Sequence, residues 1–213
     1  MTKKIRTLTV LLVLGLLNTQ GFGTPILDQH QESWHGGGAY FWAEQSFAQT
    51  FIPSVGDKLD HVEFLVDTWT DVPSVPATIS IVETVAGEPS GAIVGSVTVP
   101  QLQLGWYMVD FSSESMMLAA GTQYGLVFSN NDPGQDDGTT DGLGIEWDGN
   151  PYPGGTLWRW TPITGWEVYN AFGPAGDADI AFRTWMAPAV PAPGALVLGS
   201  IGVALVGWLR RHR

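Results

Sequence analysis

Apolar side chains recur at every second position in several short segments of the chain. Val62, Phe64 and Val66 share one face of an extended segment, and Ile79 and Ile81 repeat this pattern. Clusters of Gly, Pro, Asn and Asp separate the segments. We predict strands at 45–52, 59–68, 77–83, 95–99, 105–111, 123–129, 144–147, 157–160 and 179–185. The pattern predicts an all-β fold, a two-sheet antiparallel sandwich that is jelly-roll-like.

The first residues have a different pattern, which predicts a signal helix. Three basic residues in the first six positions precede an apolar stretch at 8–17, and the small residues Gly21 and Gly23 follow it. This order is typical of a secretory signal peptide, so we expect a cut after Gly23. The Sec translocon and signal peptidase are the partners that such a segment implies.

The last residues predict a second targeting segment. Pro191 and Pro193 cannot continue a helix, and the apolar run 194–209 that follows them carries no charge. This run is close to the ~17 residues that cross a bilayer, so we expect a transmembrane helix. Arg210, Arg211 and Arg213 then favour a cytoplasmic end.

The C-terminal segment resembles a PEP-CTERM sorting signal, the tripartite tag of exopolysaccharide-producing Gram-negative bacteria. The resemblance rests on Val190, Pro191 and Pro193, on the short apolar helix, and on Arg210, Arg211 and Arg213. Ala192 departs from the family pattern, in which Glu is usual. The resemblance implies cutting by an exosortase-type membrane protease and delivery of the exported body to the cell surface or extracellular matrix. A plain C-terminal membrane anchor is the alternative.

Charge is distributed very unevenly along the chain. Outside the two targeting ends there are three basic side chains, Lys58, Arg159 and Arg183, against all twenty-one acidic ones, a net charge of −18. Phosphate binding needs Lys and Arg, so nucleic acid is excluded as a partner. The chain has no cysteine, which excludes disulfides, thiol catalysis and thiolate metal sites.

Aromatic residues gather late in the chain and are the candidate ligand-binding residues. They are Trp147, Tyr152, Trp158, Trp160 and Trp166. Alternation places Trp158 and Trp160 on one face of a strand, where two indoles can stack on the C–H faces of sugar rings. The alternative is that these rings fill the core or cover a sheet edge, because large aromatics bury much area.

Acidic residues form two candidate metal sites. A Gly-rich segment carries Asp132, Asp136, Asp137 and Asp141, and Asp177 and Asp179 precede the last strand. Calcium takes six to eight oxygen ligands, so a structural Ca²⁺ is a candidate cofactor at either place. A solvated acidic loop that discourages edge aggregation is the alternative.

The body also resembles an uncharacterised jelly-roll domain that is common in bacterial surface and secreted proteins. The segments that carry this resemblance are QSFAQTF (45–51), LDHVEFLV (59–66), WYMVDF (106–111), LAAGTQYGLVFS (118–129) and DIAFRTW (179–185). It implies the fold and an extracellular setting, and no catalytic residue. The expected organisation is a signal peptide at 1–23, an N-terminal segment at 24–44, the sandwich at 45–187 and the sorting signal at 188–213.

Two functions are compatible with these patterns. The first is a non-catalytic surface or matrix protein that binds exopolysaccharide, and a purely structural coat component is its simplest form. The second is a polysaccharide-degrading hydrolase or lyase on the same scaffold. No nucleophile or metal motif is present in the sequence, and this favours the first function.

Overall fold

A computed structural model describes residues 23–35, 38–41, 45–67, 76–130, 141–146, 151–169 and 178–188. The chain divides into two units, Met1–Thr24 with Pro188–Arg213, and Pro25–Ala187. In the first unit the described residues are 23, 24 and 188, and Gly23 N donates to Pro188 O at 2.8 Å. The expected signal and sorting helices lie outside the described residues. Within the described part of the chain, no helix is long and apolar enough to cross a membrane.

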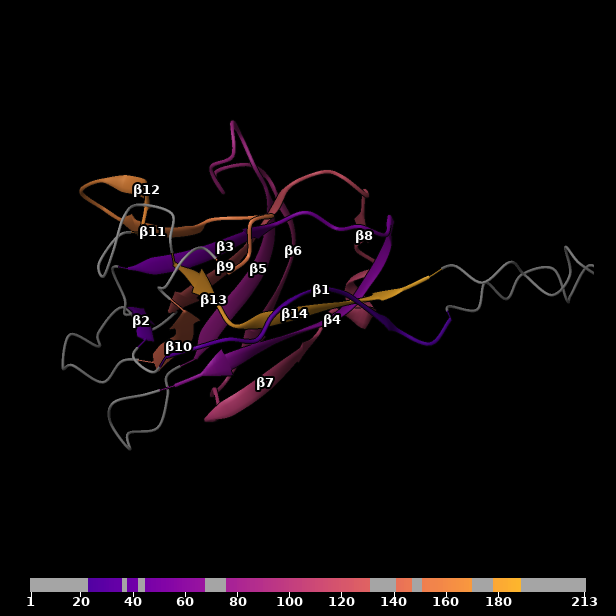
Figure 1. The fold of residues 1–213 in the computed structure, drawn as a ribbon, viewed down its shortest axis with the longest axis horizontal. Coiled ribbons are helices and arrows are strands. Elements are labelled where there is room, and N and C mark those ends of the chain that lie inside the picture. The colour runs from indigo at the N-terminus through magenta and orange to yellow at the C-terminus, as the bar shows by residue number, and fades with distance from the viewer. Residues whose placement is uncertain are drawn as a thin grey trace, which may run out of the picture. The chain divides into compact units, whose positions relative to one another are not determined.

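The second unit is a sandwich of two antiparallel sheets, as the sequence predicts (Figure 1). The larger sheet has the order β1 (Ile26–Gln31), β14 (Phe182–Ala187), β4 (Asp57–Val66), β10 (Asp141–Glu146) and β13 (Asp179–Ile180). On this sheet β2 (Gly38–Phe41) pairs with β10, and β7 (Gly105–Asp110) and β8 (Met117–Leu118) pair with β4. The described residues contain one helical turn, the 3₁₀ segment Ser112–Glu114.

The smaller sheet has six strands and carries most of the predicted aromatic cluster. Its order is β12 (Gly165–Val168), β11 (Leu157–Thr161), β3 (Ser46–Phe51), β9 (Tyr124–Asn130), β5 (Ala77–Glu83) and β6 (Ile93–Val99). Every pairing in it is antiparallel. Among the described strands β12 is the edge strand and pairs with β11 alone, whereas β11 lies between β12 and β3.

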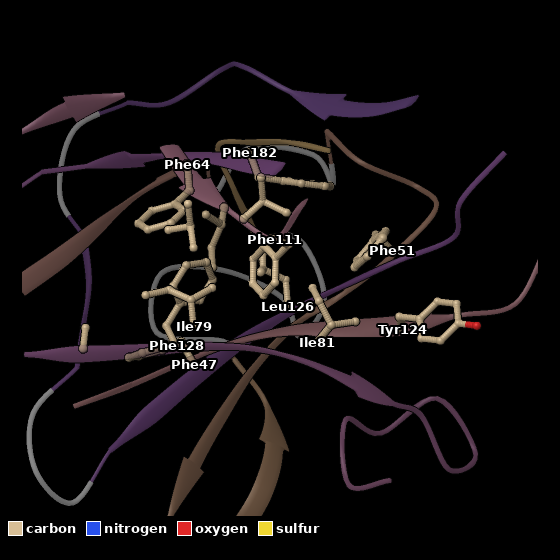
Figure 2. Packing of buried hydrophobic residues seen from close by; sticks show 14 of the residues in the cluster. Phe47, Phe51, Phe64, Ile79, Ile81, Phe111, Tyr124, Leu126, Phe128 and Phe182 are labelled. Carbon is tan, nitrogen blue, oxygen red and sulfur yellow. The ribbon is translucent and has the colours of Figure 1, made fainter. Parts of the chain in front are cut away.

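The core lies between the inner faces of the two sheets, where the alternating apolar residues point (Figure 2). Phe64 on β4 meets Phe128 on β9 edge-on, with ring centroids 4.8 Å apart, and this contact joins the two sheets. Phe51 on β3 and Phe182 on β14 lie 6.3 Å apart. Buried aromatic rings contribute large apolar areas, which a body without disulfides needs.

Each of the nine predicted strand ranges overlaps an observed strand, and the differences have physical causes. The range 179–185 is divided at Ala181 between β13, which pairs with β10, and β14, which pairs with β4. Segment 24–44 contributes β1 and β2 to the larger sheet. The alternation is hard to see in β1, ILDQHQ, because most of its side chains are polar.

Candidate functional site

Three indoles share the outer face of the six-stranded sheet, the face directed away from the core. Trp160 on β11 lies directly opposite Trp166 on β12, and Trp158 is two residues away on the same face. All three side chains are half-buried. The β11–β12 hairpin therefore presents an aromatic surface at one end of this sheet.

Trp158 and Trp166 pack against small apolar residues of the neighbouring strands. The patch beneath them consists of Ala48 on β3, Val127 on β9 and Val82 on β5, all buried. The indole N–H of Trp158 is buried and has no hydrogen-bond partner. Trp158 and Trp166 thus cover the sheet, whereas Trp160 is not part of that patch and is the indole best placed to meet a ligand.

The charged residues of the hairpin lie on its other face. Arg159 Nε donates to Glu167 Oε1 at 3.0 Å, and the Arg159 guanidinium lies 5.8 Å from the ring centroid of Tyr169. Arg159 is opposite Phe47, a core residue of β3, so this ion pair follows the inner side of the sheet. Burial raises the pKa of the Tyr169 hydroxyl. The alternation along β11 and β12 therefore separates indoles from charges.

Two rows of described residues that include the indoles cross this outer face without a charged side chain. One row of cross-strand partners runs through all six strands and consists of Trp166, Trp160, Ser46, Ser129, Thr78 and Thr98. The adjacent row consists of Val168, Trp158, Ala48, Val127, Ser80 and Ser96. Neither row holds an acidic or basic residue, although the body has a net charge of −18.

Tyr152, another candidate of the sequence analysis, is buried in the core. Its ring meets Phe182 edge-on at 5.1 Å, and its hydroxyl donates to Gln29 Oε1 at 2.8 Å. Burial raises the pKa of this hydroxyl. The structure places Tyr152 as a link between the loop before β11 and strand β1. Trp147 lies outside the described residues.

Asp179 is fully buried where the two sheets meet. Its Oδ1 accepts a hydrogen bond from Gln49 Nε2 at 2.7 Å, and its Oδ2 accepts one from the backbone N of Tyr152 at 2.9 Å. Burial raises the pKa of this carboxyl to about 7, against the effect of these two donors, which lower it. Gln49 Oε1 also accepts from Ile180 N at 2.9 Å. The carboxyl thereby joins β3, β13 and the loop before β11.

For the other candidate metal ligands, the structure describes no side-chain position. Asp132, Asp136, Asp137 and Asp177 lie outside the described residues, and for Asp141 only the backbone pairing with Phe41 is described. Among the described residues, no group of three or more His, Asp or Glu side chains is placed to hold a metal ion. The calcium site stays a prediction. The sorting-motif residues Val190, Pro191, Pro193, Arg210, Arg211 and Arg213 also lie outside the described part.

The larger sheet also has an aromatic outer face, which the sequence pattern alone does not indicate. The Arg183 guanidinium lies 4.1 Å above the ring of Trp106, and Arg183 Nη1 donates to Glu63 Oε2 at 3.1 Å. Trp185 stacks on His61, with centroids 5.2 Å apart and planes 16° from parallel. Alternation in 59–66 and 182–187 places these residues outward, but only the register brings them together. Both indoles already have a stacking partner within the protein.

No protein-family model matches this chain, and no curated protein matches it. The features that bear on function are therefore those of the chain itself. It contains a two-sheet antiparallel sandwich in which three indoles lie in two rows of described residues that hold no charge.

Proposed function

We propose that this chain is an exported surface or matrix protein whose sandwich binds a neutral exopolysaccharide without catalysis. The observation that carries the proposal is the position of Trp158, Trp160 and Trp166 on one sheet face, in two rows of described residues that hold no charge. The face of an indole is electron-rich, and the C–H groups on one side of a pyranose ring are weakly positive. Stacking of such a ring on Trp160 removes apolar surface from water on both partners.

The charge of the body supports a neutral ligand. An acidic polysaccharide approaching a domain of net charge −18 would be repelled. A neutral glycan experiences no such repulsion, and the rows beside the indoles offer hydroxyls without charges. A non-catalytic role fits the one described carboxyl with a strongly raised pKa, Asp179, because its exposed fraction is 0% and a substrate does not reach it.

The proposed destination comes from the two ends of the sequence. In this proposal residues 1–23 form a signal helix, residues 188–213 form a PEP-CTERM-like transmembrane sorting helix, and an exosortase-type protease releases the body. The sandwich between them is of the jelly-roll kind. The positions of β1 and β14 suit this arrangement, because Ile26 pairs with Met186 and both ends of the body therefore leave the sheet at one place.

Affinity electrophoresis of the full chain in gels that contain one polysaccharide each tests this function. We expect retardation by at least one neutral polymer of a panel of hydroxyethyl cellulose, mannan and dextran, and none by alginate. Trp160→Ala should reduce the retardation about tenfold, because the apolar area buried between one sugar ring and the indole is worth on the order of 1.5 kcal/mol.

The matched control is Trp34→Ala, which removes an indole that is 45% exposed and lies outside the six-stranded sheet. This variant should bind as the unaltered chain does. Trp158 is not suited to the test, since its removal uncovers Ala48 and Val127 and lowers stability. Equal losses for Trp34→Ala and Trp160→Ala, or migration unchanged in every gel, would contradict the proposed function.

A further inference from the structure

The register of the six-stranded sheet continues the indole pair into a row of hydroxyls. Trp160 lies opposite Ser46, Ser46 opposite Ser129, Ser129 opposite Thr78, and Thr78 opposite Thr98. These residues alternate with core residues such as Phe128 and Ile79, so their side chains face outward together. The row crosses every strand of the sheet, from β12 at one edge to β6 at the other.

The hydroxyls of this row are held in defined positions. Ser46 Oγ donates to Ser129 Oγ at 3.1 Å, and Thr78 Oγ1 and Thr98 Oγ1 lie 2.9 Å apart. A hydroxyl has one proton and two lone pairs, so the Ser46–Ser129 pair, linked through one proton, retains hydrogen-bonding capacity toward a third oxygen. Serine and threonine side chains thus offer hydrogen bonds to sugar hydroxyls, and they lie in the same row as the two indoles.

The spacing of the row matches an extended sugar chain. Neighbouring strands are about 4.8 Å apart, so six strands span roughly 24 Å from the first to the last. A β-1,4-linked hexopyranose chain is flat and extended, and each ring advances it by about one strand spacing. Rings above β12 and β11 would then stack on Trp166 and Trp160, and later rings would lie above Ser46, Ser129 and Thr98.

We infer that the ligand is an extended, neutral β-1,4-linked glycan that lies across the strands along this row. The site would then bind several consecutive rings within the polymer and not only its end. This inference rests on the proposed function and names the substrate class of the same face. A single terminal sugar would occupy the indole end alone. An acidic glycan is disfavoured because neither row of this face has a basic residue to receive a carboxylate.

Isothermal titration of the full chain with cello- and manno-oligosaccharides of two to six rings tests the inference. Affinity should rise with each added ring and be greatest for the hexasaccharide. Thr98→Val, at the edge farthest from the indoles, should lower hexasaccharide affinity roughly 3- to 10-fold, the effect of one lost hydrogen bond. It should leave disaccharide affinity unchanged.

Thr122→Val is the control, since Thr122 is exposed and lies outside the row. Equal affinity for two and six rings, or no effect of Thr98→Val on the hexasaccharide, would overturn the inference while the proposed function stands. Retardation by dextran without binding of either oligosaccharide series would reject the β-1,4 class. Absence of retardation by every neutral polymer would reject the proposed function as well.

Discussion

Asp179 shows how a single side chain holds this sandwich together. Its carboxyl accepts hydrogen bonds from Gln49 and from the backbone of Tyr152, and it is enclosed by protein. The enclosure disfavours the charged form more strongly than the two donors favour it, so the pKa of Asp179 rises from 3.8 to about 7. Its contribution to folding should therefore depend on pH.

The sign of this dependence follows from proton binding. Between pH 4 and pH 7 the folded chain holds the Asp179 proton more tightly than the unfolded chain does, so stability from this group falls as the pH rises through about 7. The slope is at most about 1.4 kcal/mol per pH unit for one proton. Urea unfolding of the unaltered chain should show this fall between pH 5 and pH 7, and Asp179→Asn should remove it. An identical slope in both proteins would contradict the assignment.

The contacts of individual side chains were the least predictable feature from the sequence. Asp179 is a candidate calcium ligand by its neighbours in sequence, and only the fold reveals that Gln49, far away in the chain, bonds to it. Trp158, Trp160 and Trp166 were found by composition and alternation. Which of them covers the sheet depends on Ala48 and Val127, which belong to other strands. Burial and cross-strand contacts are tertiary, so one strand's pattern does not contain them.

At the scale of elements, the loop before β11 depends on a close approach to β3. Thr50 N donates to Thr156 O at 3.0 Å, and Thr156 N donates to Thr50 Oγ1 at 2.8 Å. A Cβ on Gly155 would lie 1.7 Å from the carbonyl oxygen of Thr50. Glycine at this position therefore lets the loop join the sheet edge and set the start of β11.

Gly155→Ala should destabilise the chain by about 3 kcal/mol or more, because the clash is with backbone that must move. Gly165→Ala is the matched control: its φ is +68°, but no atom lies within 4 Å of the added Cβ, so the cost is the left-handed strain of about 1–2 kcal/mol. Thermal unfolding of both variants measures the difference. A smaller loss for Gly155→Ala than for Gly165→Ala would contradict the close approach.

Elements were predicted well where one face is apolar and poorly where it is not. Apolar residues recur at every second position in β4 and β5, and Val62, Phe64, Ile79 and Ile81 are core residues as this pattern predicts. The hydroxyl row of Ser46, Ser129, Thr78 and Thr98 was not foreseen, since alternation tells which way each side chain points but not which strands are neighbours. The order of the strands comes from pairing between distant parts of the chain.

At the scale of the whole body, the distribution of charge distinguishes the two outer faces. On the larger sheet, Arg183 forms ion pairs with Glu32 and Glu63 and lies over the ring of Trp106. The aromatic surface of this sheet therefore contains charged side chains. The two paired rows of the smaller sheet consist of indoles, hydroxyls and small apolar side chains and hold no charged residue. Two-sheet architecture was predictable from length and alternation, whereas this difference between the faces was not.

Hydroxyl-radical footprinting of the full chain saturated with hydroxyethyl cellulose, read by mass spectrometry, locates the polymer-binding surface directly. We predict that the bound polymer protects Trp160 and Trp166 from oxidation. Trp106, which is 39% exposed, and Met108, which is 56% exposed, should react equally with and without polymer, because they lie on the larger sheet. Protection of Trp106 and Met108 with none at Trp160 and Trp166 would contradict the claim that the indole face is the binding surface.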